Sequence, residues 1–267
     1  MADLSIYLFW AGFVTGSIAT VLYVAYVASA SLAVRRMSAQ TSAGTVTIST
    51  SSGGPNAGIG RLATTFTTFT VIFLAAQVAT RWSATGHAPI SNLYEFTAAF
   101  GFGIAAAYLA FEMYTRNRRF GLLGLPIVVG MLAIASTFPT EITPLVPALQ
   151  NGPLLTIHVS VMMISYAVLT VSFCGAVVYL AQGGEGRRRF ASLPSAEAAG
   201  DLAHKAVMVG FPLLGLGIAL GAWWANSAWG RYWGWDPKET SALVTWLIFA
   251  GYLHTRGLAK WRGARAA

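Results

Sequence analysis

Long apolar segments separated by short polar ones are the feature that most constrains the fold of this chain. They cover residues 5–34, 62–80, 93–114, 120–138, 154–181, 206–225 and 240–255. A helix needs about 20 apolar residues to cross roughly 30 Å of hydrocarbon, and most of these segments are long enough. The last segment is short and must use residues from its flanks. The sequence therefore predicts an all-α, polytopic membrane helix bundle with seven spans.

The composition excludes several other classes of protein. Charged residues make up 10% of the chain, whereas soluble domains carry about a quarter, so a soluble enzyme is excluded. The 17 Lys and Arg residues outnumber the 9 Asp and Glu residues, but they lie in short groups between apolar segments. This distribution is typical of membrane loops and predicts no nucleic-acid partner. The single cysteine, Cys174, excludes a disulfide framework, a CxxC pair and a CxxCH haem attachment site within this chain.

The distribution of basic residues predicts the orientation in the membrane. With the N-terminus outside, 14 of the 17 basic residues lie on the inner side, and only Arg81, Arg231 and Lys238 lie outside. This asymmetry predicts an N-out topology. Residues 37–60 are rich in Ser, Thr and Gly and predict a flexible cytoplasmic linker. The linker divides an N-terminal transmembrane helix, 1–36, from a second membrane domain, 61–267.

Five of the nine tryptophans lie within thirteen residues of the segment 223–240, which faces outward in this topology. One interpretation is an aromatic belt at the membrane interface. The other is a platform for a flat ligand, because Gly230 and Gly234 leave backbone uncovered beside the rings. Arg231 and Lys238 can meet carboxylates at the edge of such a ligand. We favour the platform, which suits a large planar acid such as haem.

The segment also resembles a known family. The pattern W-G-x-x-W-x-W-D-P-K-E-T at 229–240 resembles the WWD signature of the haem-handling proteins of cytochrome c assembly. Its DPKET ending is similar to that of the CcsA (ResC) family of the system II cytochrome c synthase. Further agreement with that family lies at 86–96, 158–167, 210–226 and 252–256. The resemblance covers about 62–256 in the expected order.

The chain departs from the family pattern in two places. Ser241 stands where family members carry Trp, which we expect to change packing and not chemistry. The family continues through an eighth helix to an outer histidine, one of two axial haem ligands, whereas this sequence stops at Ala267. We expect either that the sequence is truncated or that the second axial ligand comes from elsewhere.

The resemblance implies a function and partners. It implies haem delivery across the membrane and covalent attachment of haem to CxxCH motifs of apocytochrome c on the outer face. The chain would be a subunit of a cytochrome c haem lyase, acting with a CcsB (ResB) type membrane partner, with haem b as its ligand. The implied location is the cytoplasmic membrane, or the thylakoid membrane if the source is a plastid. A haem transporter and a structural membrane subunit, both without ligase activity, are the alternatives.

The resemblance also implies a set of haem-binding residues. It implies iron ligation by His158 near the tryptophan loop and by His254 at a deeper site shared with the partner protein. The remaining candidates for haem contact are Trp224, Trp229, Arg231, Trp233, Trp235 and Asp236. No nucleophile of a catalytic triad, phosphate loop or HExxH motif is present in the sequence, which agrees with chemistry carried by haem and the substrate thiols.

Each histidine also has a plainer interpretation. His158 can instead bond to a neighbouring carbonyl, and His254 can extend to the interface beside Arg256. For His87 we favour a role in loop structure or contact with a haem propionate over iron ligation. For His204 we favour a solvated position at a helix end.

Four acidic residues lie at the ends of spans, where we expect their charge to reach the lipid headgroups: Glu95, Glu112, Asp236 and Glu239. Asp236 before Pro237 additionally predicts the start of a helix. The spacing of Gly217 and Gly221 permits close helix contact, but it is common by chance in glycine-rich membrane chains. Cys174 is predicted to be a small core residue.

Overall fold

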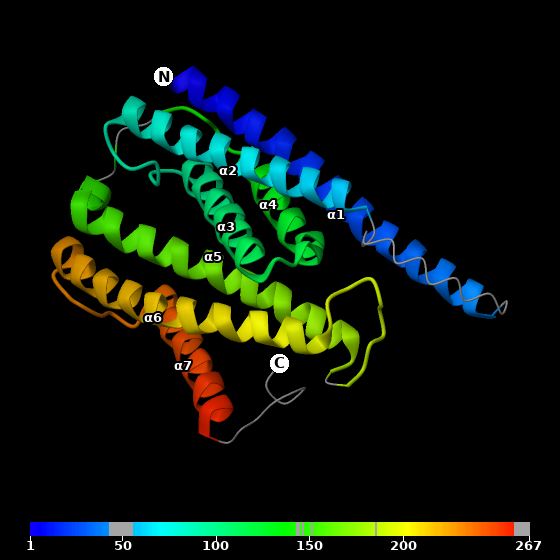
Figure 1. The fold of residues 1–267 in the computed structure, drawn as a ribbon. Helices are drawn as coiled ribbons and strands as arrows, with labels where there is room; N and C mark the ends of the chain where they lie inside the picture. The colour runs from blue at the N-terminus through cyan, green and yellow to red at the C-terminus, as the bar shows by residue number, and fades with distance from the viewer. Residues whose placement is uncertain (43–55, 143–144, 146, 151, 185, 259–267) are drawn as a thin grey trace.

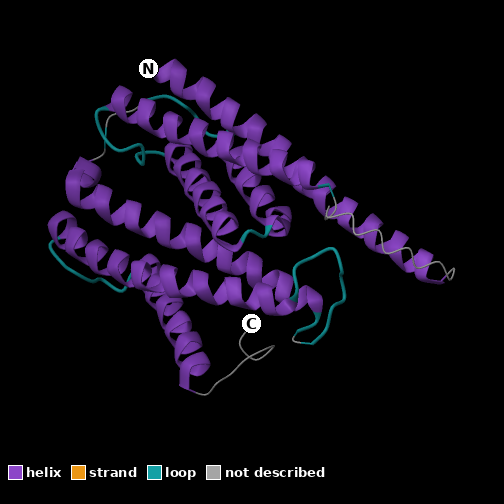
Figure 2. Cartoon of the chain, viewed as in Figure 1, coloured by secondary structure: helices purple, strands orange, loops and turns teal. Residues whose placement is uncertain are grey.

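A computed structural model shows that the described part of the chain folds into helices joined by loops. The structure describes all residues except 43–55, 143–144, 146, 151, 185 and 259–267. No strand is present among the described residues (Figure 2). The helices are α1 (Ala2–Ser42), α2 (Ala57–Thr85), α3 (Leu93–Thr115), η1 (Arg118–Phe120), α4 (Gly121–Ala135), η2 (Pro147–Gln150), α5 (Gly152–Gln182), α6 (Ala196–Trp229) and α7 (Pro237–Leu258). The all-α bundle is confirmed.

Six of the seven long helices are long and apolar enough to cross a membrane, where η1 counts with α4. The exception is α7, which is 22 residues long but less apolar than the others. Helix α1 continues to Ser42, beyond the expected boundary at residue 36, and α2 begins at Ala57. Most of the expected linker lies outside the described residues.

Local capping explains where the helices near the tryptophan segment begin and end. The Asp236 side chain accepts a hydrogen bond from the Glu239 backbone N–H at 2.7 Å, so it caps α7 as predicted. Asn92 caps α3 in the same way, through the Glu95 N–H at 2.8 Å. Gly230 ends α6 with a φ of 70°, a conformation that glycine adopts at no steric cost. We call the end of the bundle that carries residues 230–236 the outer end.

Helices α5 and α6 lie side by side and antiparallel, and they form the most extensive contact between two helices in the described structure (Figure 1). Three α5 side chains seven residues apart donate to α6 carbonyls that are also seven residues apart. The bonds run from His158 Nδ1 to Gly217 O (2.8 Å), from Ser165 Oγ to Gly210 O (2.9 Å) and from Ser172 Oγ to Ala203 O (3.0 Å). Small residues at these positions let the backbones approach closely, and polar side chains then join them. These three hydrogen bonds fix the register of α5 against α6.

Two carboxylates that we expected at the headgroups are instead buried, so that expectation was wrong for both. Glu95 is 1% exposed and pairs with Arg81 at 2.9 Å, and Arg81 also donates to Thr140 O at 2.7 Å. Glu112 is 4% exposed and accepts hydrogen bonds from Tyr23 of α1, Tyr108 of α3 and Thr64 of α2. The position of a residue at the end of an apolar segment predicts its depth in the membrane. It does not predict whether neighbouring helices bury its side chain.

Helix α7 is held less firmly than the rest. Figure 1 shows that it runs at an angle to α6, and none of its described side chains is fully buried. One of its contacts is made by Trp246, whose ring stacks on Phe211 of α6 with 5.0 Å between the centroids. The start of α7 therefore depends on the cap and on the loop before it.

The N-out orientation remains a prediction, and cysteine labelling tests it. In a Cys174→Ala background, Ser227→Cys at the outer end is expected to react with an impermeant maleimide in intact cells, because Ser227 is exposed. Ser51→Cys is expected to react only after the membrane is opened. The reverse pattern would contradict the orientation inferred from the basic residues.

Candidate functional site

The tryptophan segment closes a cavity at the outer end of α5, α6 and α7. The cavity has a volume of about 480 Å³, within the range of pockets that bind small molecules and cofactors. Its wall includes six of the predicted site residues: His158, Trp224, Trp229, Arg231, Trp233 and Asp236. Residues from α5, α6, the loop and α7 are thus brought to one place.

Two predicted site residues do not line this cavity. Trp235 is 69% exposed and meets the ring of Trp233 edge to face, with 5.6 Å between centroids. Its φ of 56° lies in the left-handed region, which is strained for a bulky residue. His254 is exposed on α7, away from this end. The structure therefore groups Trp235 with the rim of the cavity and separates His254 from it.

His158 is held so that one ring nitrogen stays free. Its side chain is 8% exposed, and Nδ1 lies 2.8 Å from the Gly217 carbonyl oxygen. A carbonyl only accepts, so Nδ1 carries the proton and Nε2 has the lone pair. Nε2 has no partner among the described residues. A carbonyl bond of this kind fixes the orientation of metal-binding histidines, so the carbonyl interpretation and the ligand interpretation both fit this side chain.

A glycine on α6 makes room for this imidazole. A Cβ atom at Gly221 would lie 2.6 Å from His158 Cε1, closer than side chains pack. The sequence analysis noted the spacing of Gly217 and Gly221 but gave it no role. Their role is visible only once α5 is placed against α6, because nothing in the local sequence connects them to His158.

A methyl group at Gly221 is therefore expected to disturb the site. Gly221→Ala should displace the His158 ring and destabilise the protein by about 1–3 kcal/mol through overpacking. Gly251→Ala on α7 is the matched control, because no atom lies within 4 Å of its Cβ position. That change should stabilise the helix by up to about 1 kcal/mol. Thermal unfolding in detergent measures both, and equal midpoints for Gly221→Ala and wild type would contradict the packing.

The two acidic side chains of the cavity wall each bond to the backbone. The Glu239 carboxylate accepts from the Gly234 backbone N–H at 2.7 Å, and Asp236 caps α7. Glu239 thereby ties the loop to the first turn of α7. Both acids lie at the start of α7, at the span end, and there they line the cavity and hold its backbone. Their contact with the headgroups remains a prediction.

The donors of the cavity are largely unused. Trp224 Nε1 and Trp233 Nε1 are buried and have no hydrogen-bond partner among the described residues. Arg231 and Lys238 also line the cavity, and neither forms an ion pair with a described residue. The wall therefore offers two basic side chains without an ion pair and, at His158 Nε2, a free nitrogen lone pair.

The other histidines lie apart from this cavity. His87 is partly buried in the loop after α2, where Nδ1 lies 2.9 Å from Ala88 O, which fits a role in loop structure. His204 is half-buried and not fully solvated, in a larger cavity of about 840 Å³ between α5, α6 and α7. There its Nδ1 lies 3.4 Å from the hydroxyl of Tyr252, to which Arg256 donates at 3.1 Å.

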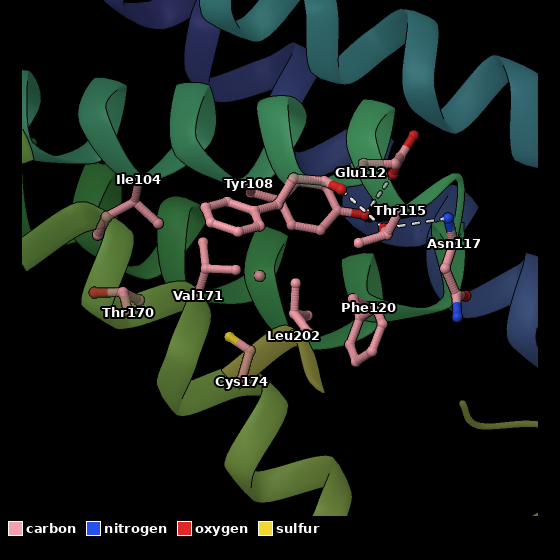
Figure 3. A pocket seen from close by; sticks show the side chains of 12 residues that line it. Ile104, Tyr108, Glu112, Thr115, Asn117, Phe120, Thr170, Val171, Cys174 and Leu202 are labelled. Carbon is pink, nitrogen blue, oxygen red and sulfur yellow. Dashed lines mark hydrogen bonds between the residues drawn. The ribbon is translucent and has the colours of Figure 1, made fainter. Parts of the chain in front are cut away.

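A third cavity lies inside the bundle beside Glu112. Figure 3 shows Tyr108 and Glu112 of α3 on one side of it and Cys174 of α5 on the other. Its volume of about 10 Å³ is at the lower limit for one water molecule. This cavity is too small for a substrate, and Cys174 in its wall is a buried core residue, as predicted.

The outer cavity also limits the form in which a metal can bind. No cluster of three or more His, Cys, Asp or Glu side chains suited to a metal ion occurs among the described residues. His158 is a single ligand, whereas protein sites for bare metal ions use three or four. Iron already held by a macrocycle needs only such an axial ligand.

Comparisons with known proteins show which family the chain is similar to. The family described as "Cytochrome C assembly protein" matches residues 90–267, which include every site residue named above. The chain is 36% identical over 254 residues to "Cytochrome c biogenesis protein CcsA" of Porphyra purpurea, covering 79% of each chain. Proteins of the same name from Microcystis aeruginosa and Synechocystis sp. are 36% and 34% identical, over 73% of this chain and 75% and 76% of theirs.

Proposed function

Because the chain belongs to the cytochrome c assembly protein family, and so to the membrane proteins of cytochrome c biogenesis, we propose that its outer cavity holds haem for attachment to apocytochrome c. His158 Nε2 would bind the iron, and Trp224, Trp229 and Trp233 would surround the macrocycle. The haem would be haem b, which carries both vinyl groups unmodified. The partner would be a membrane protein of the CcsB (ResB) type.

The observation that carries this proposal is the free Nε2 of His158 in the wall of a cavity of suitable size. The fit can be tested on the residues themselves. The imidazole is fixed by Gly217 and its ring is cradled by Gly221. Arg231 and Lys238 line the cavity without an ion pair to a described residue, which suits an acidic ligand. A flat, iron-containing dicarboxylate meets all three conditions.

The chemistry of attachment places few demands on the chain. The S–H bond of a substrate cysteine adds across a haem vinyl group, so that sulfur bonds to one carbon and the proton goes to the other. Atoms and electrons balance without a further oxidant or reductant. The chain would contribute orientation and exclude water, which lowers the entropic cost of the encounter. This division agrees with a described cavity wall that contains no Ser, Thr or Cys.

Haem attachment in a host without its own cytochrome c maturation system tests the proposal. Such cells would express the chain with its CcsB-type partner and an exported CxxCH reporter. We expect haem to be bound covalently to the reporter, as haem staining of a denaturing gel would show. Haem export without attachment would support a transporter instead. Normal c-type cytochromes after deletion of the natural gene would support a structural subunit.

The deeper site is a separate proposal that rests on His254. Because His254 is exposed on α7 and far from the outer cavity, His254→Ala is expected to lower the haem content of the purified complex with the partner. The outer site should keep its haem, because His158 is unchanged. Unchanged haem content at normal expression would favour the interpretation that His254 only extends to the interface.

A further inference from the structure

The cavity of about 840 Å³ between α5, α6 and α7 has no part in the haem sites proposed above. Figure 1 shows that α7 runs at an angle to α6, and the cavity lies between these two helices and α5. It belongs to the end of the bundle where α6 begins at Ala196, which we call the inner end. None of the candidate haem-binding residues lines it. Its volume is within the range of ligand pockets.

The wall of this cavity changes from polar to apolar with distance from the inner end. The charged and titratable side chains of the wall lie near that end: Glu197, Asp201 and His204 of α6 and Arg256 of α7. Farther along the helices the wall is mainly apolar, with Leu169, Phe173, Val207, Ile248 and Phe249. This division suits a ligand with a charged head and an apolar tail.

The polar part of the wall lies at the depth of lipid headgroups. Helix α6 has 34 residues, so it is about 51 Å long, whereas the hydrocarbon of a bilayer is about 30 Å thick. A centred, upright helix of this length extends about 10 Å beyond the hydrocarbon at each end. His204 follows Ala196 by eight residues, a distance of about 12 Å. It therefore lies where headgroups meet hydrocarbon.

A basic side chain is held at this depth without a counter-charge. Arg256 Nη1 donates to the Tyr252 hydroxyl at 3.1 Å, and this hydroxyl lies 3.4 Å from His204 Nδ1. Arg256 is partly buried and forms no ion pair with a described residue. Arginine has five N–H donors, and one of them bonds to a described side chain. The others can bind a phosphate, as basic side chains between membrane helices do.

Two acidic side chains of the wall make a purely anionic ligand unsuitable. Glu197 and Asp201 precede His204 on α6, so they lie nearer to the water at the inner end. Asp201 pairs with Lys205 at 2.8 Å, whereas Glu197 forms no ion pair with a described residue. An anionic headgroup would meet repulsion from these acids. A zwitterionic headgroup instead places an ammonium beyond its phosphate, on the side where the acids lie.

We propose that a zwitterionic glycerophospholipid of the inner leaflet occupies this cavity. Its phosphate binds Arg256, its ammonium lies toward Glu197 and Asp201, and an acyl chain follows the apolar part of the wall. The lipid fills the space between α6 and α7, and so supports α7, in which no described side chain is fully buried. The site is separate from the proposed deep haem site, because His254 does not line the cavity.

Three lipids with the same acyl chains test recognition of the headgroup. Phosphatidylethanolamine, phosphatidylglycerol and diacylglycerol are each titrated into the delipidated full chain in detergent, and native mass spectrometry counts the bound molecules. We expect one phosphatidylethanolamine to bind at least about 10-fold more tightly than phosphatidylglycerol, and diacylglycerol to bind more weakly than both. Equal binding of the three lipids would overturn the proposal.

Substitutions in the wall test the residues. Arg256→Gln should weaken binding of phosphatidylethanolamine by about 10-fold or more, whereas Arg256→Lys keeps a cation and should weaken it less. Glu197→Gln combined with Asp201→Asn should remove the preference over phosphatidylglycerol. Arg189→Gln is the control, because Arg189 is exposed and does not line the cavity. Equal weakening by Arg256→Gln and Arg189→Gln would show general attraction to the lipid, and would overturn this site.

Assembly with the CcsB-type partner distinguishes a lipid from a helix of that partner. The bound phosphatidylethanolamine should remain when the complex forms. Its loss on assembly would show that the partner fills the cavity, which would overturn the proposal. Haem binding at His158 is independent of all these measurements, so failure of the lipid site leaves the haem site intact.

Discussion

In cells that depend on this chain for cytochrome c maturation, His158→Gly is expected to lower the haem attached to apocytochrome c by at least about 100-fold. Removing a side chain that only supports a metal ligand lowers metal affinity or activity by about 10- to 100-fold. Here the ligand itself is removed, so we expect at least the upper value. The imidazole also presents a nitrogen lone pair that is free to bind iron. Haem staining of the exported cytochrome, normalised to chain expression, measures the loss.

A second histidine provides the control for this result. His87→Ala should leave attachment near the wild-type level, because the His87 ring bonds only to the adjacent Ala88 carbonyl and does not line the cavity. An equal loss for both variants would indicate that the outer end has been damaged in general. Wild-type attachment by His158→Gly at normal expression would contradict its assignment as the ligand.

The largest expected effect on stability comes from the buried ion pair near the same end. Glu95→Ala leaves the Arg81 guanidinium, 1% exposed, without its counter-charge. Breaking a buried pair in this way costs about 3–5 kcal/mol. The substitution also removes the carboxylate that accepts from Ser91 at the start of α3. Chemical unfolding of the purified protein in detergent gives the change.

Asp201→Ala is the matched control for Glu95→Ala. Asp201 also pairs with a basic residue, Lys205, at 2.8 Å, but its side chain is 58% exposed. An exposed pair contributes less than about 1 kcal/mol, so this variant should unfold close to wild type. Similar losses in the two variants would show that burial does not determine the strength of the Arg81–Glu95 pair.

The sequence predicts the fold of this chain well because the patterns that define its helices lie within short, continuous segments. The length of an apolar segment determines whether a helix can cross the membrane, and no knowledge of neighbouring helices is needed. The Asp236 cap is predicted for the same reason, since it acts over three residues. The lower hydrophobicity of α7 is also predicted, because the apolar segment at 240–255 is short.

The site is predicted less completely because its geometry depends on pairs far apart in the chain. Six of the eight candidate residues line one cavity, but the sequence does not show that Trp235 points elsewhere. Gly221 leaves room for the His158 ring and Gly217 bonds to it, although His158 lies about sixty residues earlier in the chain. Arg81 and Glu95 lie on different helices, so their mutual burial could not be inferred from their positions at span ends.

The most direct test of the central claim is the absorption spectrum of haem bound to purified protein, with and without His158. We expect wild type to carry haem with the spectrum of histidine-ligated iron, and His158→Gly to lose most of it. Added imidazole should fill the space left by the side chain and restore the spectrum, whereas it should not affect wild type. If His158→Gly retains the wild-type haem content and spectrum without imidazole, His158 does not bind the iron and the outer cavity is not the haem site described here.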